Sequence, residues 1–139
     1  MKLQMKCDML FSKYIRHKHS DKQGRVKCYT CGTKAPIEMM TLGHWQKRRH
    51  LGTRYNEINC QPQCIPCQGR SESGDGDMNF EARLRLQYGD KEIDRIIQLA
   101  RSVVHMSEID YEELYDELQR DFKKLKQNAT DSRSFPEND

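Results

Sequence analysis

The chain has 139 residues, which is enough for one domain of ordinary size. Hydrophobic residues make up 35% of it and charged residues 32%, so the apolar core is small and a further cross-link such as a bound metal is expected. No run of 18 apolar residues is present and the charged N-terminal stretch has no apolar signal segment. These features exclude a helical membrane span and argue for a protein of the reducing cytoplasm.

The net charge of +3 conceals two halves of opposite sign. Residues 1–70 carry 14 Lys/Arg and 4 Asp/Glu, a net charge of +10, whereas residues 71–139 carry 10 Lys/Arg and 17 Asp/Glu, a net charge of −7. A basic half that also contains the cysteines indicates a polyanionic partner at that end. The alternative is a dipolar protein whose charges only keep it in solution.

The first half of the chain predicts a helix and two short strands. Apolar residues recur at helical spacing over residues 3–19, between lysines and arginines, which indicates a short amphipathic basic helix. The stretch RVKCYTCG at 25–32 is typical of a strand followed by a turn that presents two cysteines. Residues 37–46 are apolar enough for a second strand, in which Gly43 marks a bend or a close backbone approach. We expect residues 47–59 to form a cationic loop.

The second half predicts helices. The stretch 69–77 is rich in turn-forming residues and is expected to be a polar loop. Apolar residues at intervals of three and four then indicate helices over 78–88 and 91–104. Ser107 followed by Asp110 is typical of a capping box, so a last helix is expected to begin there.

Two Cys-x-x-Cys pairs give the strongest chemical signal. Two residues between cysteines allow both thiolates to bind one tetrahedral ion, and two such pairs complete a closed, structural zinc site. We therefore predict zinc at Cys28, Cys31, Cys64 and Cys67. Redox-active or free thiol pairs are the alternative. Cys60 could replace one ligand, and Cys7 fits the apolar face of the first helix.

A histidine lies between the two pairs, at the end of a predicted strand. His44 follows Gly43, and four cations come within the next ten residues, namely Lys47, Arg48, Arg49 and Arg54. Arginines can hold phosphates and offset charge that develops on them, and a neutral imidazole can take a proton from water. The alternatives are a histidine that only makes structural hydrogen bonds and a cationic loop that only holds nucleic acid.

Asn59 directly precedes the second cysteine pair. An asparagine at such a place is often a turn residue or a helix cap. The functional interpretation is a side-chain amide that fixes the loop after His44.

Together these residues resemble a known protein family. The order Cys28-x-x-Cys31-Gly32, Gly43-His44-Trp45, Arg48, Arg54-Tyr55, Asn59 and Gln63-Cys64-x-x-Cys67 is similar to that of the NinG/Rap recombination proteins of phage lambda. LFSKYIR at 10–16 and NFEARLRLQYG at 79–89 extend the resemblance over most of residues 9–125. The family is similar in turn to the HNH, or His-Me finger, nucleases, in which a β-hairpin and a helix clasp a metal ion. Its members act as structure-selective endonucleases on branched DNA.

The resemblance implies roles for particular residues. His44 would be the general base, Asn59 would orient its loop and Arg48 would assist catalysis at the phosphate. The catalytic Mg²⁺ or Mn²⁺ would be held by His44 and Gln68, and the DNA by Lys47, Arg48, Arg49, His50 and Arg54. One departure concerns this ion, because family members usually have Asn after the last cysteine and many HNH nucleases have an acidic residue before the base. Here these positions are Gln68 and Gly43, and Glu38 or His50 are the alternative ligands.

These observations predict an α+β fold with a zinc-braced ββα-metal core, an N-terminal helix and a helical C-terminal extension. We expect the nuclease core at 1–77, the extension at 78–127 and a disordered tail at 128–139. The predicted function is metal-dependent cleavage of branched DNA (Holliday junctions, D-loops or flaps) during phage recombination, in the cytoplasm of the bacterial host. A non-catalytic zinc protein that binds nucleic acid is the main alternative, and an adaptor that docks a protein through 107–127 is a weaker one. The amphipathic last helix could also support a homodimer.

Overall fold

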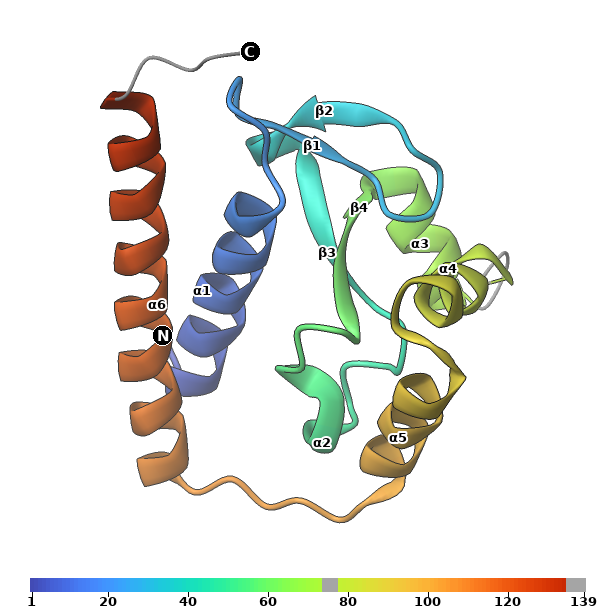
Figure 1. The fold of residues 1–139 in the computed structure, drawn as a ribbon. Coiled ribbons are helices and arrows are strands. Elements are labelled where there is room, and N and C mark those ends of the chain that lie inside the picture. The colour runs from blue at the N-terminus through green and yellow to red at the C-terminus, as the bar shows by residue number, and fades with distance from the viewer. Residues whose placement is uncertain (74–77, 135–139) are drawn as a thin grey trace.

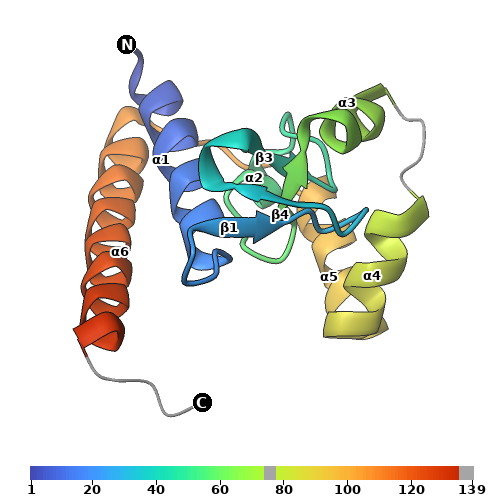
Figure 2. The same ribbon diagram turned by 90° about the horizontal axis from the view of Figure 1, so that it is seen from above.

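A computed structural model describes residues 1–73 and 78–134 of the chain (Figure 1). The elements in chain order are α1 (Leu3–Lys18), β1 (Arg25–Lys27), β2 (Lys34–Pro36), the short 3-10 helix η1 (Ile37–Met39), β3 (Met40–His44), α2 (Leu51–Arg54), β4 (Cys60–Cys64), α3 (Ile65–Ser73), α4 (Met78–Tyr88), α5 (Asp90–Arg101) and α6 (Glu108–Ser134). Helices α1 and α6 lie on one side of the strands, and α3, α4 and α5 lie on the other (Figures 1 and 2). None of the helices in the described ranges is long and apolar enough to cross a membrane.

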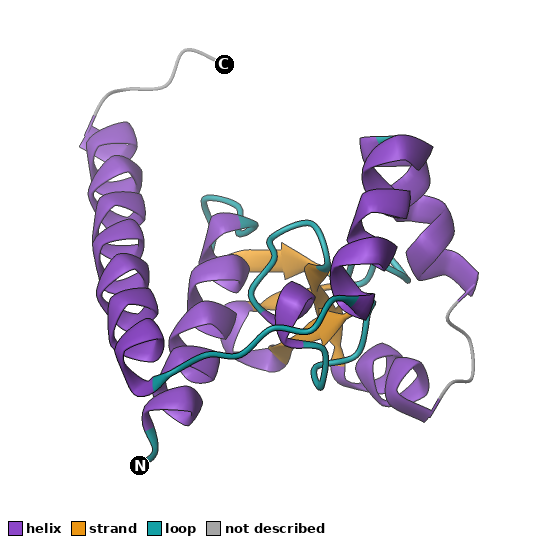
Figure 3. Ribbon diagram, turned by 90° about the horizontal axis from the view of Figure 1, so that it is seen from below, coloured by secondary structure: helices purple, strands orange, loops and turns teal. Residues whose placement is uncertain are grey.

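The strands form two small antiparallel pairs in the middle of the molecule (Figure 3). In the first pair Arg25 lies opposite Pro36, and in the second Met40 lies opposite Cys64 and His44 lies opposite Cys60. The chain passes directly from β4 into α3, which packs on β3 and β4. The second pair and α3 therefore form a strand–strand–helix unit, and His44 stands at the end of its first strand.

Two apolar clusters attach the helices to this unit. On one side Phe80, Leu84, Ile93 and Ile96 of α4 and α5 surround Trp45, the residue after β3. On the other side Phe11 and Ile15 of α1 meet Leu118 of α6 and Cys60 of β4. Helices α1, α4 and α5 each bury residues three or four apart, which is the spacing that places side chains on one helical face. The His44 end of the strands is thus held from both sides.

The predicted first and last helices are confirmed. Helix α1 covers all but the last residue of the predicted 3–19, and Cys7 is fully buried on its inner face. The capping box is also present, because the backbone N–H of Asp110 donates to Ser107 Oγ and the backbone N–H of Ser107 donates to Asp110 Oδ2. Helix α6 continues to Ser134, so residues 128–134 of the predicted tail are part of this helix. Residues 135–139 lie outside the described ranges.

Other boundaries also differ from the sequence prediction. The loop expected at 69–77 is wrong for 69–73, which belong to α3 because the packing of this helix on β3 and β4 overrides its turn-rich composition; residues 74–77 lie outside the described ranges. The loop expected at 47–59 contains the single-turn helix α2. Gly43 does mark a close approach, because a Cβ there would overlap the buried side chain of Gln63.

Helix α2 supports the loop after His44 by packing on α5, and this contact depends on a glycine. A Cβ at Gly52 would overlap the backbone oxygen of Leu99, which cannot move without shifting α5. We expect Gly52→Ala to lower the free energy of unfolding by about 1–3 kcal/mol. Gly69→Ala in α3 is the matched control, because a Cβ there meets nothing within 4 Å. Urea denaturation of both variants tests this, and equal stability would contradict the close contact.

Candidate functional site

The four predicted cysteines come together at one place. Cys28 and Cys31 lie in the turn between β1 and β2, Cys64 ends β4, and Cys67 is in the first turn of α3. Their Sγ atoms all lie within 4.8 Å of one another, and those of Cys31 and Cys64 are 3.7 Å apart. A tetrahedral zinc with bonds of about 2.3 Å places its sulfurs about 3.8 Å apart. The cluster therefore has the ligands and spacing of a structural zinc site.

The surroundings of the cluster favour the thiolate form of Cys28, which is the form that binds a metal ion. Burial raises the pKa of Cys28, but hydrogen bonds from backbone amides and the hydroxyl of Thr30 outweigh it and lower this pKa to about 6. Burial and the neighbouring thiols raise the pKa of Cys64 to about 12. A bound cation would displace the remaining protons. Cys60 is not a ligand of this cluster, because it is fully buried and its thiol points to the carbonyl of Arg54.

Measurement of the metal content distinguishes the four cysteines of the cluster from Cys60. We expect the purified protein to hold one zinc per chain, Cys64→Ser to lose it together with its cooperative unfolding transition, and Cys60→Ser to retain it. Elemental analysis with thermal denaturation measures both effects. Retention of zinc by Cys64→Ser, or its loss from Cys60→Ser, would contradict the ligand set.

His44 is held at the end of β3 by a backbone carbonyl. Its Nε2 lies 3.0 Å from the oxygen of Arg54. A carbonyl can only accept, so Nε2 carries the hydrogen and Nδ1 keeps its lone pair. Burial is the main reason why the pKa of His44 lies below the usual 6.5, and the charges of Arg48 and Arg54 lower it further. The ring is thus neutral at pH 7, with Nδ1 as its proton acceptor.

His44 lines a small cavity of about 140 Å³. The other residues that line it come from four parts of the chain and are Asp8, Phe11 and Ser12 of α1, Leu42 of β3, Arg48 of the following loop and Gln68 of α3. The cavity therefore combines a histidine, a carboxylate, an amide and a cation. Three residues to which the resemblance assigns roles, His44, Arg48 and Gln68, all line this cavity.

Asn59 determines the shape of the loop that follows His44. Its Oδ1 accepts from the backbone N–H of Gln46 at 2.7 Å, and its Nδ2 donates to the carbonyls of Gln46 and Thr53 at 3.1 Å each. The side chain is fully buried, so each of these hydrogen bonds would be costly to lose. Asn59 thus joins the start of the loop to its end, although it does not line the His44 cavity.

The predicted DNA-binding cations fall into two groups. The guanidinium of Arg54 is bound by Asp8 and by the carbonyl of Arg48, and Lys47 Nζ donates to the carbonyl of Ser71 in α3. These two side chains stabilise the fold. Arg48 and Arg49 are exposed, and His50 is half-buried before α2. The cationic surface of this loop is therefore smaller than its sequence suggests.

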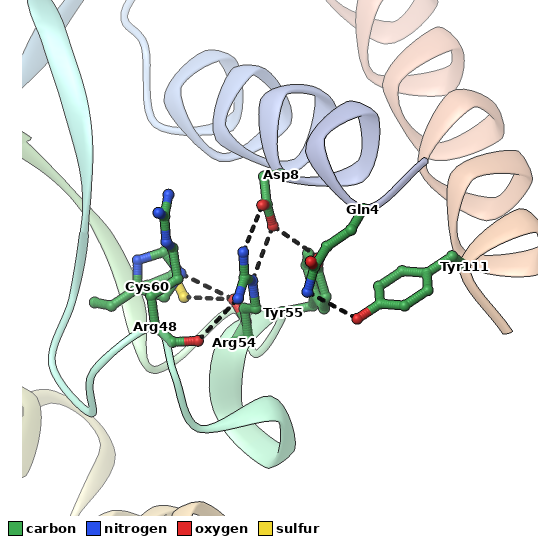
Figure 4. A network of polar contacts seen from close by, with 8 residues as sticks. Gln4, Asp8, Arg48, Arg54, Tyr55, Cys60 and Tyr111 are labelled. Atoms are coloured by element: carbon green, nitrogen blue, oxygen red, sulfur yellow. Dashed lines mark hydrogen bonds and ion pairs between the residues drawn. The ribbon is translucent and has the colours of Figure 1, made fainter. Parts of the chain in front are cut away.

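The residue that sequence reasoning missed is Asp8. Its carboxylate binds Arg54 Nη2 at 2.6 Å and Nε at 3.0 Å, and it accepts from the hydroxyl of Tyr55 at 2.7 Å (Figure 4). Because the carbonyl of Arg54 holds His44, Asp8 fixes that carbonyl from α1. A separate hydrogen bond, from Gln4 Nε2 to the hydroxyl of Tyr111, links α1 to α6. The only signal in the sequence was that Asp8 is the one acidic residue among residues 1–20.

The Asp8–Arg54 pair is expected to contribute strongly to stability. Its side chains are only 20% and 13% exposed, and removal of one partner leaves the other charge without compensation. We expect Asp8→Asn to lower the free energy of unfolding by about 2–3 kcal/mol. The exposed pair of Lys18 and Glu57 is the control, so Glu57→Gln should cost about 0–1 kcal/mol. Chemical denaturation of the zinc-loaded variants tests this, and equal costs would contradict the account.

Fold and site define a small protein of mixed helices and strands with a four-cysteine cluster that fits a metal ion. The family described as Bacteriophage Lambda NinG protein matches residues 2–128. The chain therefore belongs to the NinG family. Comparison with curated proteins and comparison with solved structures each gave no match.

Proposed function

We propose that the protein is a metal-dependent endonuclease that cleaves branched DNA in phage recombination. The observation that carries this proposal is His44, a neutral imidazole that lines a cavity together with Arg48 and whose Nδ1 can accept a proton. The strand–strand–helix unit and its four-cysteine brace add support, since the resemblance to HNH nucleases implies the same order of elements. Membership in a phage family is consistent with a recombination substrate.

His44 would act as the general base. With Nε2 occupied by the carbonyl of Arg54, Nδ1 would take a proton from the water that attacks the scissile phosphate. Arg48 lines the same cavity and would offset charge on the phosphate. The same lone pair cannot also bind a metal ion, so the general-base role excludes His44 as a ligand.

The cavity contains two oxygen donors that suit a small divalent ion, the amide of Gln68 and the carboxylate of Asp8. Mg²⁺ commonly takes one or two protein oxygens and fills the rest of its shell with water and phosphate. Bound there, it would stabilise charge on the phosphate and on the leaving 3′ oxygen. Asp8 also holds Arg54 and Tyr55, so we expect weak binding in the absence of DNA.

That use of Asp8 also supports a second candidate function. Among the residues that the structure describes, Asp8 is the only carboxylate that lines the His44 cavity, and Arg54 already neutralises it. A protein that binds branched nucleic acid without cutting it would need no metal ligand there. Such a protein would show salt-sensitive binding and no strand breaks in any metal.

A cleavage assay distinguishes the two functions. We expect the zinc-loaded protein to nick labelled four-way junctions or flaps in Mg²⁺ or Mn²⁺, and His44→Ala to reduce the rate by at least about 100-fold while binding is kept. His105→Ala, an exposed histidine between α5 and α6, is the matched control and should remain active. Absence of cleavage by the wild type in every metal would reject the nuclease.

The pH dependence of the wild-type cleavage rate gives a second test of His44 as the base. The neutral form of His44 is the active base, and its pKa is lowered, so activity should be lost only as the pH falls through a value below 6.5. We expect a rate that is flat near pH 7 and declines on the acid side. A rate that still rises steeply above pH 7 would contradict His44 as the base.

A further inference from the structure

The outer face of α1 carries a row of side chains that the core does not use. Lys2, Lys6, Met9 and Lys13 recur at intervals of four, three and four, opposite the buried face formed by Cys7, Phe11 and Ile15. All four are exposed, and Met9 is 57% exposed. We refer to Lys6, Met9 and Lys13 as the α1 strip. It combines two cations with a flexible apolar side chain.

The lysines of the strip have no acidic partner among the described residues. Three other cations of the basic half have partners within the chain, since Lys18 pairs with Glu57, Arg54 pairs with Asp8, and Arg16 donates to three backbone carbonyls. No ion pair or hydrogen bond of the described ranges involves the side chains of Lys6 or Lys13. Two charges that stabilise no contact within the chain remain available for an anion.

The strip is continuous with the candidate active site. An open hollow of about 520 Å³ runs beside α1 and is lined by Lys6, Met9, Lys13 and Arg48, among others. Asp8, Ser12 and Arg48 line both this hollow and the His44 cavity. A chain of phosphates that reaches His44 could therefore continue past Arg48 onto the strip.

We propose that the α1 strip binds the phosphodiester backbone of a second arm of the branched DNA whose scissile phosphate lies at His44. This inference rests on the proposed function. Lys6 and Lys13 are about 10 Å apart along the helix, which spans about three steps of a DNA strand. Met9 lies between them and offers adaptable apolar contact to a deoxyribose or an unpaired base at the branch. Helix α6 packs beside α1, and its acidic side chains repel DNA. This repulsion favours a DNA path that leaves the strip toward Arg48.

Binding measurements test the strip independently of cleavage. In a His44→Ala background without added Mg²⁺ or Mn²⁺, Lys6→Gln with Lys13→Gln is compared with Lys123→Gln with Lys124→Gln. The control pair removes the same charge from exposed positions on α6. The probes are a labelled four-way junction and a duplex of about one helical turn, at several salt concentrations. Zinc content and circular dichroism verify the fold.

We expect the α1 variant to bind the junction about tenfold more weakly and to reduce the slope of log affinity against log salt by about 1.8, as loss of two phosphate contacts predicts. The short duplex should lose less, and the α6 control should change neither value. An unchanged slope, or equal losses in both variants, would overturn the proposal. So would selective loss of polyglutamate binding with junction binding intact, which would assign the strip to an acidic protein.

The two proposals can fail separately. A wild type that never cuts DNA but shows the selective slope change would reject the nuclease and retain the strip as a nucleic-acid surface. A wild type that cuts junctions while the α1 variant binds and cuts normally would retain the nuclease and reject the strip.

Discussion

The four-cysteine cluster connects parts of the chain that no large core would hold together. It ties the turn between β1 and β2 to the end of β4 and the start of α3. Cys64 is paired with Met40 in the strand register, so the brace acts on β3 as well as on β4. Beside it the apolar cluster of the described residues buries only Val26 and Met40 apart from two of the cysteines themselves, with Ala35 and Ile37 partly buried against them. A metal ion would supply the stability that so few apolar residues cannot.

The position of His44 depends on this brace through a short series of contacts. The register of β3 and β4 sets where β3 ends, Asn59 sets the shape of the loop, and the loop returns the carbonyl of Arg54 to Nε2. Asp8 then holds Arg54 from the first helix. Two polar networks, a buried one around Asn59 and a partly buried one around Asp8, thereby orient a single imidazole. A network of this kind loses stability when one of its polar groups is left unpaired. Other orientations of the ring would leave groups unpaired and are therefore disfavoured.

Sequence reasoning identified the features that local spacing determines. The two Cys-x-x-Cys pairs, the amphipathic periodicity of α1 and the capping box at Ser107 each involve residues only a few positions apart. It missed features that depend on distant partners. No sequence pattern indicated that the guanidinium of Arg54 binds Asp8, which lies 46 residues before it in the chain. Residues 69–73 were expected in a loop, but α3 is stabilised by packing on the strands and by Lys47, whose ammonium group binds the carbonyl of Ser71. Neither interaction can be predicted from the residues that are neighbours in the sequence.

The central claim is that His44 is neutral with its hydrogen on Nε2. Long-range proton–nitrogen NMR spectra of zinc-loaded protein with ¹⁵N-labelled histidine report this directly, and His44→Ala assigns the signal. The account predicts a protonated Nε2 and a Nδ1 that lacks hydrogen at pH 7, because the carbonyl of Arg54 accepts from Nε2 and burial lowers the pKa. A charged ring at pH 7, or a neutral ring with its hydrogen on Nδ1, would contradict it.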